Sequence, residues 1–424
     1  MRIDRSIIYN STIFRSLKHK NFRLHFTGQS ISLIGTWMQR VAISWLVYRI
    51  TGSTFLLGLV TFLSLIPSLV LAPYAGSFID RHDKYKIVFI TQIGLMVQAG
   101  ILALIVWLSY YNIMMIATLS LAQGIINTFD TTARQSLMVD LVDNKEDLPN
   151  AIALNSSAFN AARLVGPAFA GFILSTFGED ICFLINFLSF FVVIGCLLQM
   201  KLKIVQHEKS EENIWADLRK GYDYLRESPD LSSLILMLAA SSLLVIPYTT
   251  LLPAIAKDVF NGNATTFSWF ESAAGLGALF GAIYMAMLRP GKDLNQLTIF
   301  SSILFAVAVI CLGFSSQIWV ALIATGFTGA GLMVQNSTIN TYLQTHATSE
   351  MRARTLSYYI MAYQGVLPIG SLIMGILAER LGVSAVVFSE GVAGVLIVIG
   401  FILHQRKLHD GDWMRSMNPL RFRH

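Results

Sequence analysis

The sequence predicts an all-α integral membrane protein with twelve transmembrane helices arranged as two pseudo-symmetric six-helix bundles. Composition, two long uncharged runs and the placement of basic residues lead to this prediction. Of the 424 residues, 54% are hydrophobic and 13% are charged, whereas soluble domains carry about 25% charged residues. This composition excludes a water-soluble enzyme, a disordered chain and a disulfide scaffold. The three cysteines lie within apolar runs and are expected to be small buried hydrophobic residues.

The uncharged runs indicate the number of spans. No Asp, Glu, Lys or Arg occurs in the 43 residues between Lys86 and Asp130, or in the 56 residues between Asp293 and Glu350. Because one helix needs about 20 apolar residues to cross the hydrocarbon core, each run holds two spans joined by a turn. The same length places the twelve spans at about 24–48, 56–78, 87–108, 113–134, 151–177, 181–200, 231–256, 266–288, 294–314, 318–343, 354–378 and 384–403.

The basic residues predict the orientation. If the chain starts in the cytoplasm, 26 of the 31 Lys and Arg residues lie in inner segments and three lie in outer loops. The other two, Arg40 and Arg163, lie within predicted helices. The positive-inside rule therefore places both termini on the cytoplasmic side of a bacterial cytoplasmic (inner) membrane. This distribution also accounts for the net charge of +6, so no nucleic acid is needed as a partner. No cleavable signal peptide is apparent, because the first apolar segment is too long.

The chain divides into three parts. We expect an N-terminal six-helix bundle at 1–200, a cytoplasmic linker at 201–230, and a C-terminal six-helix bundle with a basic tail at 231–424. Apolar residues recur at helical spacing in the linker and predict an amphipathic helix lying against the bundle ends. A recruitment site for a partner is the alternative. The apolar residues are Trp215, Leu218, Tyr222 and Leu225.

The two halves resemble each other weakly. Residues 171–178, GFILSTFG, parallel residues 375–382, GILAERLG, and each segment follows a proline, Pro167 or Pro368, that is expected to interrupt its helix. Parallel six-helix repeats with a site between them are typical of transporters.

The loop after the second span carries a recognisable pattern. It runs from Gly76 through Asp80, Arg81 and Lys84, with a glycine, an acid four residues later, and then alternating basic residues. This pattern resembles the signature loop of the major facilitator superfamily, with Asp83 standing where the general pattern has a second glycine.

The fifth span carries a second pattern. Arg163, Gly166, Pro167 and Gly171 are similar to the Gly-Pro motif of the superfamily's antiporters, with one glycine rather than two near its end. The resemblance implies a helix-breaking element and antiport.

A narrower resemblance covers residues 21–180. It is to the branch called transmembrane secretion effectors, which implies the major facilitator fold, export and a siderophore-like substrate. The segments that carry it are Asn21–Arg23, Gly28–Gln29, Gly35–Gln39, Thr51–Ser53, Asp80–Arg81, Asp130–Ser136, Asn150–Asn155 and Gly166–Pro167.

Acids and bases at the cytoplasmic ends of the second and fourth spans are expected to pair, because a carboxylate at that depth is costly when unpaired. Asp80 with Arg81, and Asp130 with Lys84, would form a conformational latch on the cytoplasmic side in the outward-open state. The alternative is a pair within one helix, Asp130 with Arg134, at i, i+4. The two arrangements can coexist.

Polar stripes on several spans predict the substrate cavity, because such a stripe faces protein or water rather than lipid. Interhelical hydrogen bonds are the alternative for each small polar residue. Amides suit neutral polar groups, and tyrosines form a wall for amphiphiles. The predicted substrate-binding residues are Gln29, Ser32, Thr36, Arg40, Gln123, Asn127, Arg163, Gln335, Asn336, Tyr359 and Tyr363.

Four charges lie deep within predicted spans: Arg40, Arg163, Glu271 and Glu390. Arg40 and Arg163 would face an anionic substrate group. Glu271 is the candidate proton-coupling group, with pairing to an arginine of the other half as the alternative. Glu390, on the twelfth span, is expected to be structural.

These features predict a secondary active transporter and not an enzyme. It would export a small, amphiphilic, partly anionic metabolite by alternating access with proton antiport. A broad drug efflux carrier, or a lipid or metabolite facilitator or importer, is the alternative. No close histidine pair, CxxC or phosphate-binding loop occurs, so we expect no cofactor and no metal. The expected partners are the substrate, protons and the bilayer, with the chain acting as a monomer.

Overall fold

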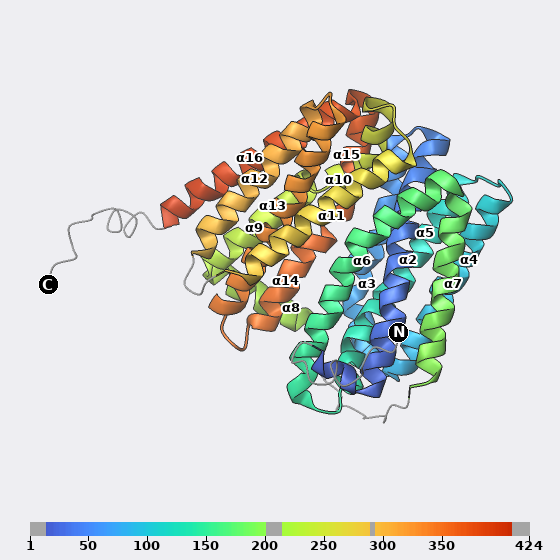
Figure 1. Cartoon of the computed structure of the whole chain (residues 1–424). Coiled ribbons are helices and arrows are strands. Elements are labelled where there is room, and N and C mark those ends of the chain that lie inside the picture. The colour runs from blue at the N-terminus through green and yellow to red at the C-terminus, as the bar shows by residue number, and fades with distance from the viewer. Residues whose placement is uncertain (1–13, 201–213, 289–292, 409–424) are drawn as a thin grey trace. The chain divides into compact units, whose positions relative to one another are not determined.

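The computed structural model describes residues 14–200, 214–288 and 293–408, which form helices and short connections without a strand (Figure 1). The element order begins with the short helix η1 (Arg15–Lys18). The longer helices are α2 (Lys20–Thr51), α3 (Thr54–Asp80), α4 (Lys84–Trp107), α5 (Ile113–Leu137), α6 (Leu148–Thr176), α7 (Glu179–Leu198), α8 (Ile214–Glu227), α9 (Pro229–Leu244), α10 (Tyr248–Ala254), α11 (Ala264–Ala286), α12 (Leu294–Phe314), α13 (Ile318–His346), α14 (Arg352–Ile360), α15 (Leu367–Leu381) and α16 (Val383–Leu408).

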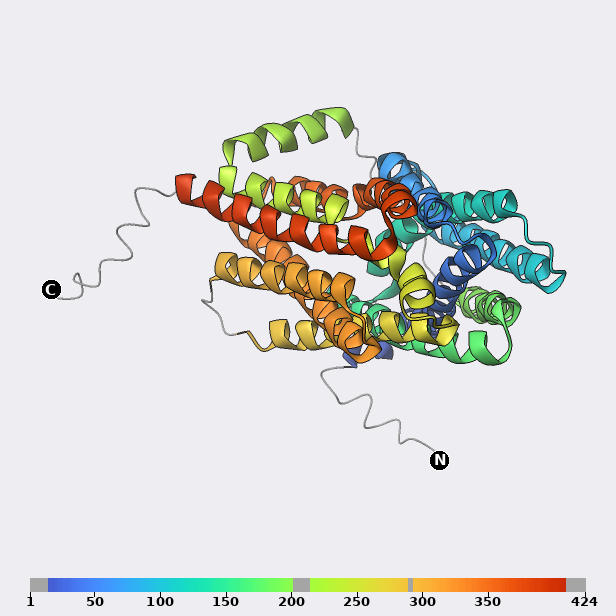
Figure 2. The same cartoon turned by 90° about the horizontal axis from the view of Figure 1, so that it is seen from above.

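Helices α2 to α7 pack side by side in the first of two compact units (Figures 1 and 2). Helix α2 packs on α6 and α7, α3 packs on α5, and α4 packs on α5 and α7. Phe22, Ile79 and Leu141 lie fully buried in the hydrophobic core between them. Between α5 and α6, the chain forms the short helices η2 (Met138–Leu141) and η3 (Lys145–Asp147).

The first unit also contains Thr250–Gly275, a segment of the sequence's second half. The ring of Trp45 on α2 stacks on Phe267 of α11, with centroids 6.5 Å apart. The Tyr48 hydroxyl donates to the Asp258 carboxylate. This grouping places the start of α11 with the first unit, whereas the division into 1–200 and 231–424 stays a prediction.

The second unit contains α9, the later part of α11, and α12 to α16. Helix α12 packs against both α13 and α16, and Leu234, Ile339 and Leu343 are fully buried in the core. The backbones of α11 and α13 approach so closely that a Cβ added to Gly277 would collide with the Gly326 carbonyl oxygen. Small residues at this crossing are what allow such close contact between membrane helices.

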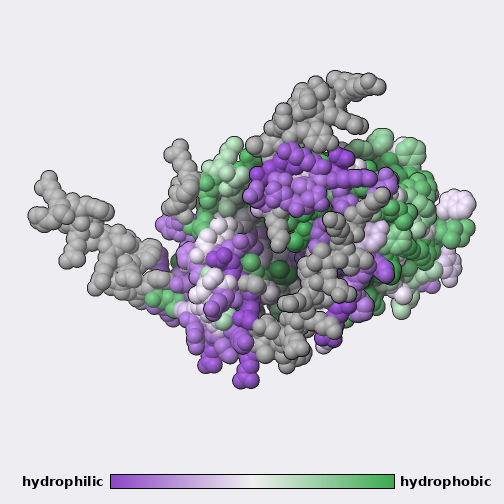
Figure 3. Space-filling view, turned by 90° about the horizontal axis from the view of Figure 1, so that it is seen from below, coloured by the Kyte–Doolittle hydropathy of each residue, from purple (hydrophilic) through white to green (hydrophobic). Residues whose placement is uncertain are grey.

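Ten of the described helical segments are long and apolar enough to cross a membrane. Helices α2 and α11 are not among them, although they occupy the predicted first and eighth spans. The polar stripe of α2 lowers its hydropathy, so a membrane-spanning role for this helix stays a prediction. Large hydrophobic side chains within the helices, such as Phe280, Phe300 and Ile323, are exposed. Hydrophilic side chains gather at the helix ends seen from below in Figure 3.

The two prolines expected to interrupt helices behave differently. Pro167 lies inside α6, which continues through it without a break, so its expected helix-breaking effect is wrong. The corresponding span of the second half is divided, because the π-helical segment η5 (Met361–Gly365) is followed by α15, with Pro368 in its first turn. A similar π-helical segment, η4 (Ile255–Val259), follows α10. Proline is tolerated in the first turn because its missing N–H has no intrahelical partner there.

Helix α8 lies in the predicted linker and packs on the second unit. Leu225 is buried in the core of that unit, and the Tyr358 hydroxyl donates to the Leu218 carbonyl oxygen at 2.9 Å. Tyr222 is exposed, so the apolar face is narrower than its spacing predicts. The side chain of Trp215 and residues 201–213 lie outside the described part of the chain.

Candidate functional site

Two arginines of the first unit lie against one tryptophan, and one acid lies near the arginines. The guanidinium carbon of Arg40, on α2, lies 5.0 Å from the centre of the Trp37 ring, and that of Arg163, on α6, lies 5.9 Å from it. Glu271, on α11, is within electrostatic reach of both arginines. The structure thus brings together three helices and three of the residues predicted for substrate binding and proton coupling.

The sequence pattern does not predict Trp37 as a site residue. It precedes Arg40 by three positions, a spacing at which side chains meet on a helix surface, so its contact with Arg40 could be predicted from the sequence. Its contact with Arg163 could not, because Arg163 lies on another helix. Phe159 contacts the Trp37 ring edge-on, with centroids 5.7 Å apart. A cation over an indole face gains about 0.5 to 2 kcal/mol, so Trp37 orients both guanidinium groups.

Close helix packing positions this group. A Cβ added to Gly166 of α6 would lie 2.5 Å from the Trp37 Cβ, and one added to Gly171 would lie 2.5 Å from the Ser268 Cβ of α11. The predicted Gly-Pro motif therefore brings α6 close to both α2 and α11. Pro167 also has no N–H to donate to the carbonyl oxygen of Arg163, four residues earlier.

The Arg163 guanidinium has no hydrogen bond or ion pair to another described residue, and it lies against the Trp37 ring. Its side chain is half-buried, the Arg40 side chain is exposed, and Glu271 is half-buried. An arginine presents five N–H donors in a fixed planar arrangement that matches carboxylates. The cluster can therefore receive an anionic group at the exposed Arg40 side chain.

A second charged network surrounds Asp130, which is fully buried. One carboxylate oxygen accepts from Thr91 and from Gln92, each at 2.8 Å. The other contacts the Arg134 guanidinium, which also donates to Gln29. The i, i+4 pair within α5 is thus present, and Gln29 contacts Arg134 rather than standing free on a cavity wall.

The predicted pairing of Asp130 with Lys84 is not formed in this structure, so the latch stays a prediction. The Lys84 ammonium lies 3.8 Å from the Asp140 carboxylate instead. Arg134 reaches Asp130 from one turn along the same helix, so it needs no long-range ordering to neutralise the buried acid. A latch between α4 and α5 would require Lys84 to leave Asp140 and bind Asp130.

The signature loop shows why Asp83 replaces the usual glycine. Its carboxylate accepts the backbone N–H groups of Tyr85 at 3.0 Å and Lys86 at 3.3 Å, and so caps α4. A Cβ added to Gly76 would meet nothing within 4 Å, so packing alone does not require this glycine. Arg81 ends α3 and is exposed. The side chain of Asp80 lies outside the described part, so its predicted pairing with Arg81 stays a prediction.

The remaining polar positions of α2 and α5 differ in accessibility. Ser32 is buried, and the Thr36 hydroxyl donates to the Ser32 carbonyl oxygen at 2.9 Å. These two side chains are therefore occupied by burial and by a bond within the helix, and do not form an open surface. Gln123 is half-buried and Asn127 is exposed on α5, where both remain available.

A chain of buried amides links three helices of the first unit. Gln39 donates to Gln98 at 3.0 Å and accepts from Asn186 at 2.8 Å. Each of the three side chains is at most 3% exposed. Buried amides need such partners because an unpaired one costs about 1 to 3 kcal/mol. Their polarity was visible in the sequence, but their partners depend on helix packing.

In the second unit, the predicted polar residues form a separate group. Tyr359 stacks on Tyr363 with ring centroids 6.4 Å apart, and its hydroxyl donates to the Asn336 backbone carbonyl at 3.3 Å. Gln335 is fully buried and faces Ser241 at 3.4 Å, so it is not on an accessible surface as predicted. Glu390 is 1% exposed, and neither carboxylate oxygen has a hydrogen-bond partner among the described residues.

Comparison with known proteins identifies the family. The transmembrane secretion effector profile matches residues 11–423. The chain belongs to this family. It is therefore a multi-pass membrane transporter of the major facilitator superfamily and not an enzyme, as the sequence predicts.

Relatives of this chain have different substrates in their names. The chain is 26% identical over 391 residues to the staphyloferrin A transporter of Staphylococcus aureus, covering 90% of this chain and 96% of that protein. It is 22% identical to macrolide efflux protein A of Streptococcus pyogenes, covering 90% and 96%. It is 24% identical to the enterobactin exporter EntS of Shigella flexneri, covering 91% of each.

Solved structures support the fold of this family member. A bacterial homologue of the lysosomal transporter Spinster, in an inward-facing unoccupied conformation, matches with a TM-score of 0.72 and 12% identity, over 92% of this chain and 98% of that one. A bacterial homologue of the iron transporter ferroportin, also inward-facing, matches with a TM-score of 0.67 and 17% identity, over 91% and 98%. At these identities the similarity concerns the fold alone.

Proposed function

We propose that this protein exports a small, partly anionic, amphiphilic metabolite across the bacterial cytoplasmic membrane, with a carboxylate-bearing siderophore-like molecule as its substrate class. The observation that carries the proposal is the pair of guanidinium groups, Arg40 and Arg163, on one Trp37 ring. The Arg163 guanidinium has no hydrogen bond or ion pair to another described residue. In a membrane interior a guanidinium without an anion is costly, so the cluster favours an anionic substrate.

The names of two relatives support this substrate class. The staphyloferrin A transporter and the enterobactin exporter are both named for siderophores. The macrolide efflux relatives support a second candidate, a broader drug efflux carrier. Such a carrier depends more on adaptable apolar surface and less on fixed charge, which is why the arginine cluster favours the first candidate.

Glu271 is proposed as the proton-coupling residue for antiport. Its protonation removes the negative charge that faces Arg40 and Arg163, and so changes the relative free energies of the states of the carrier. A change of 1.4 kcal/mol, equivalent to about one pKa unit, shifts a population ratio about tenfold. Within the second unit, the stacked rings of Tyr359 and Tyr363 are proposed as an aromatic surface for amphiphiles.

The direct test uses inverted membrane vesicles from cells that express the protein, with and without a proton gradient. Export predicts uptake into these vesicles of a citrate-based or catecholate siderophore, faster with the gradient than without it. A lipophilic cation and a macrolide are the comparison substrates. Uptake of the lipophilic cation alone would favour the drug carrier, and flux in the opposite direction would favour an importer.

Both termini are proposed to face the cytoplasm, because 26 basic residues lie in the segments this orientation makes internal. A tag at either terminus is expected to resist protease added to intact spheroplasts and to be cleaved after lysis. Cleavage in intact spheroplasts would reverse the orientation.

Substitutions at Asp130 can show whether its charge serves the stability of the fold, a conformational latch, or both. Replacing Asp130 by Asn leaves the half-buried Arg134 without its anion, and removing one partner of a buried pair costs up to about 3 to 5 kcal/mol. We expect a lower melting temperature in detergent for Asp130→Asn and recovery in the double variant Asp130→Asn, Arg134→Gln. If the charge also serves a latch, transport by the double variant stays well below wild type. Wild-type transport by the double variant would make the pair purely structural.

A further inference from the structure

An interaction at the helix ends joins the starts of two helices in the first unit. His19 immediately precedes α2, and Asp147 immediately precedes α6. The His19 Nε2 lies 3.0 Å from the Asp147 carboxylate. These two residues occupy the N-cap positions of their helices, yet neither side chain caps its own helix. Aspartate is among the best N-cap residues, so the carboxylate of Asp147 serves the contact between helices instead.

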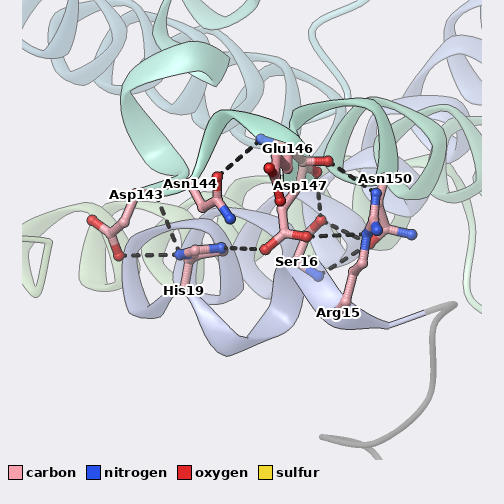
Figure 4. Close-up of polar contacts among 8 residues, drawn as sticks. All are labelled: Arg15, Ser16, His19, Asp143, Asn144, Glu146, Asp147 and Asn150. Carbon is pink, nitrogen blue, oxygen red and sulfur yellow. Dashed lines mark hydrogen bonds and ion pairs between the residues drawn. The ribbon is translucent and has the colours of Figure 1, made fainter.

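Neighbouring residues reinforce this contact (Figure 4). Arg15 forms an ion pair with Asp147 at 3.0 Å and donates to the Glu146 carbonyl oxygen at 2.9 Å. Ser16 is fully buried, its backbone N–H donates to the Asn150 side-chain oxygen at 3.0 Å, and its hydroxyl lies 2.7 Å from the same oxygen. We call these residues, with His19 and Asp143, the α2–α6 clamp.

The second ring nitrogen of His19 has two possible partners on one residue. Its Nδ1 lies 3.1 Å from the Asp143 carboxylate and 3.3 Å from the Asp143 backbone N–H. A carboxylate only accepts and a backbone N–H only donates. The protonated ring therefore donates to both acids, and the neutral ring keeps its bond to Asp147 while accepting the backbone N–H of Asp143. The clamp thus accommodates both charge states with different strengths.

We infer that His19 is a positioning residue that couples the proton concentration on its side of the membrane to the relative position of α2 and α6. These helices carry Arg40 and Arg163, the two arginines on Trp37. A change at their joined ends therefore changes the spacing of the proposed substrate groups. The clamp itself follows from the geometry alone, whereas its effect on transport rests on the proposed function.

The charged groups around the His19 ring determine whether acidic pH strengthens or weakens the clamp. The acids facing it are Asp143 and Asp147, with Glu146 beside them, and Arg15 is the nearby base. Burial lowers the pKa of His19, but its bonds to Asp147 and Asp143 and their charges outweigh burial and raise the pKa above 6.5. A raised folded-state pKa gives stability that is complete below 6.5 and is lost as pH rises through the higher value. The clamp is therefore stronger at acidic pH.

Hydrogen exchange on the full-length protein in nanodiscs measures the clamp. The backbone N–H of Ser16 is the reporter because it bonds Asn150. From pH 8.5 to pH 5.5 we expect its protection factor, corrected for intrinsic exchange, to rise about tenfold for each unit by which the pKa is raised. His19→Gln abolishes this rise. Asn150→Ala, the matched control, lowers protection at both pH values by the same factor. An unchanged rise in His19→Gln would overturn the inference.

Nitrogen-15 spectra of labelled histidine, assigned by the loss of one signal in His19→Gln, test the partner exchange. We expect the neutral His19 ring to carry its proton on Nε2. We expect Asp143→Asn to lower the pKa of His19 without changing that tautomer. A neutral ring protonated on Nδ1 would overturn the proposed arrangement.

Transport assays then test the positioning role. In oriented vesicles, His19→Gln is expected to remove part of the pH dependence measured on the clamp's side, with KM for anionic substrate changing more than the maximal rate. An identical pH profile in His19→Gln and wild type would overturn this role. If no substrate is transported by wild type, the proposed function fails, while the exchange and nitrogen-15 measurements still decide the clamp.

Discussion

Replacing Arg40 by Gln is expected to raise the KM for anionic substrates by about ten- to a hundredfold, because a hydrogen bond to a charged group contributes about 1.5 to 3 kcal/mol. The KM of neutral substrates should change by less than about threefold. Arg40→Lys keeps the charge but not the planar group of donors, so its KM is expected to lie between wild type and Arg40→Gln. Initial rates of uptake into inverted vesicles, measured over a substrate panel, provide the comparison.

Two controls make this result specific to the cluster. Arg23→Gln removes one positive charge from an exposed position near the start of the same helix and is expected to leave KM unchanged. Trp37→Phe keeps an aromatic face, whereas Trp37→Leu removes it, so the leucine variant should lose more affinity for anions. Equal losses for anionic and neutral substrates in Arg40→Gln would show that the arginine supports packing rather than recognition.

Glu271→Gln is expected to abolish the stimulation of export by a proton gradient, because the side chain keeps its shape but no longer titrates. At least a tenfold loss of gradient-dependent flux is expected if protonation shifts the states by 1.4 kcal/mol. Removing the acid also leaves Arg40 and Arg163 without their anionic neighbour, so the KM for anionic substrates should fall. Export with and without an imposed gradient, in the same vesicles, measures both effects.

Glu390→Gln is the matched control for Glu271, since both are acids within helices and Glu390 lies in the second unit, outside the arginine cluster. It is expected to keep the response to the gradient. If Glu271→Gln responds fully to the gradient, Glu271 has no part in coupling. If Glu390→Gln loses the response as well, coupling is not specific to the cluster.

The sequence by itself determined the class of the protein and its helical, membrane-spanning character. A spanning segment must bury its backbone hydrogen bonds within itself and present about 20 apolar residues, and both requirements are local. The signature loop and the Gly-Pro motif also pointed to the family, because they are contiguous patterns. The motif was predicted to break its helix, whereas the helix is continuous through Pro167, and Gly166 and Gly171 allow close helix packing.

The tertiary structure decided which polar groups meet. Asp130 pairs with Arg134 and not with Lys84, and Gln335 is buried against another helix, because side-chain partners depend on the rotation and separation of packed helices. The same holds for Trp37 beneath Arg163, and for His19 between two acids more than a hundred residues away. Hydropathy is a property of one segment and can be summed along the chain. A pairwise contact belongs to two segments, and only their packing determines it.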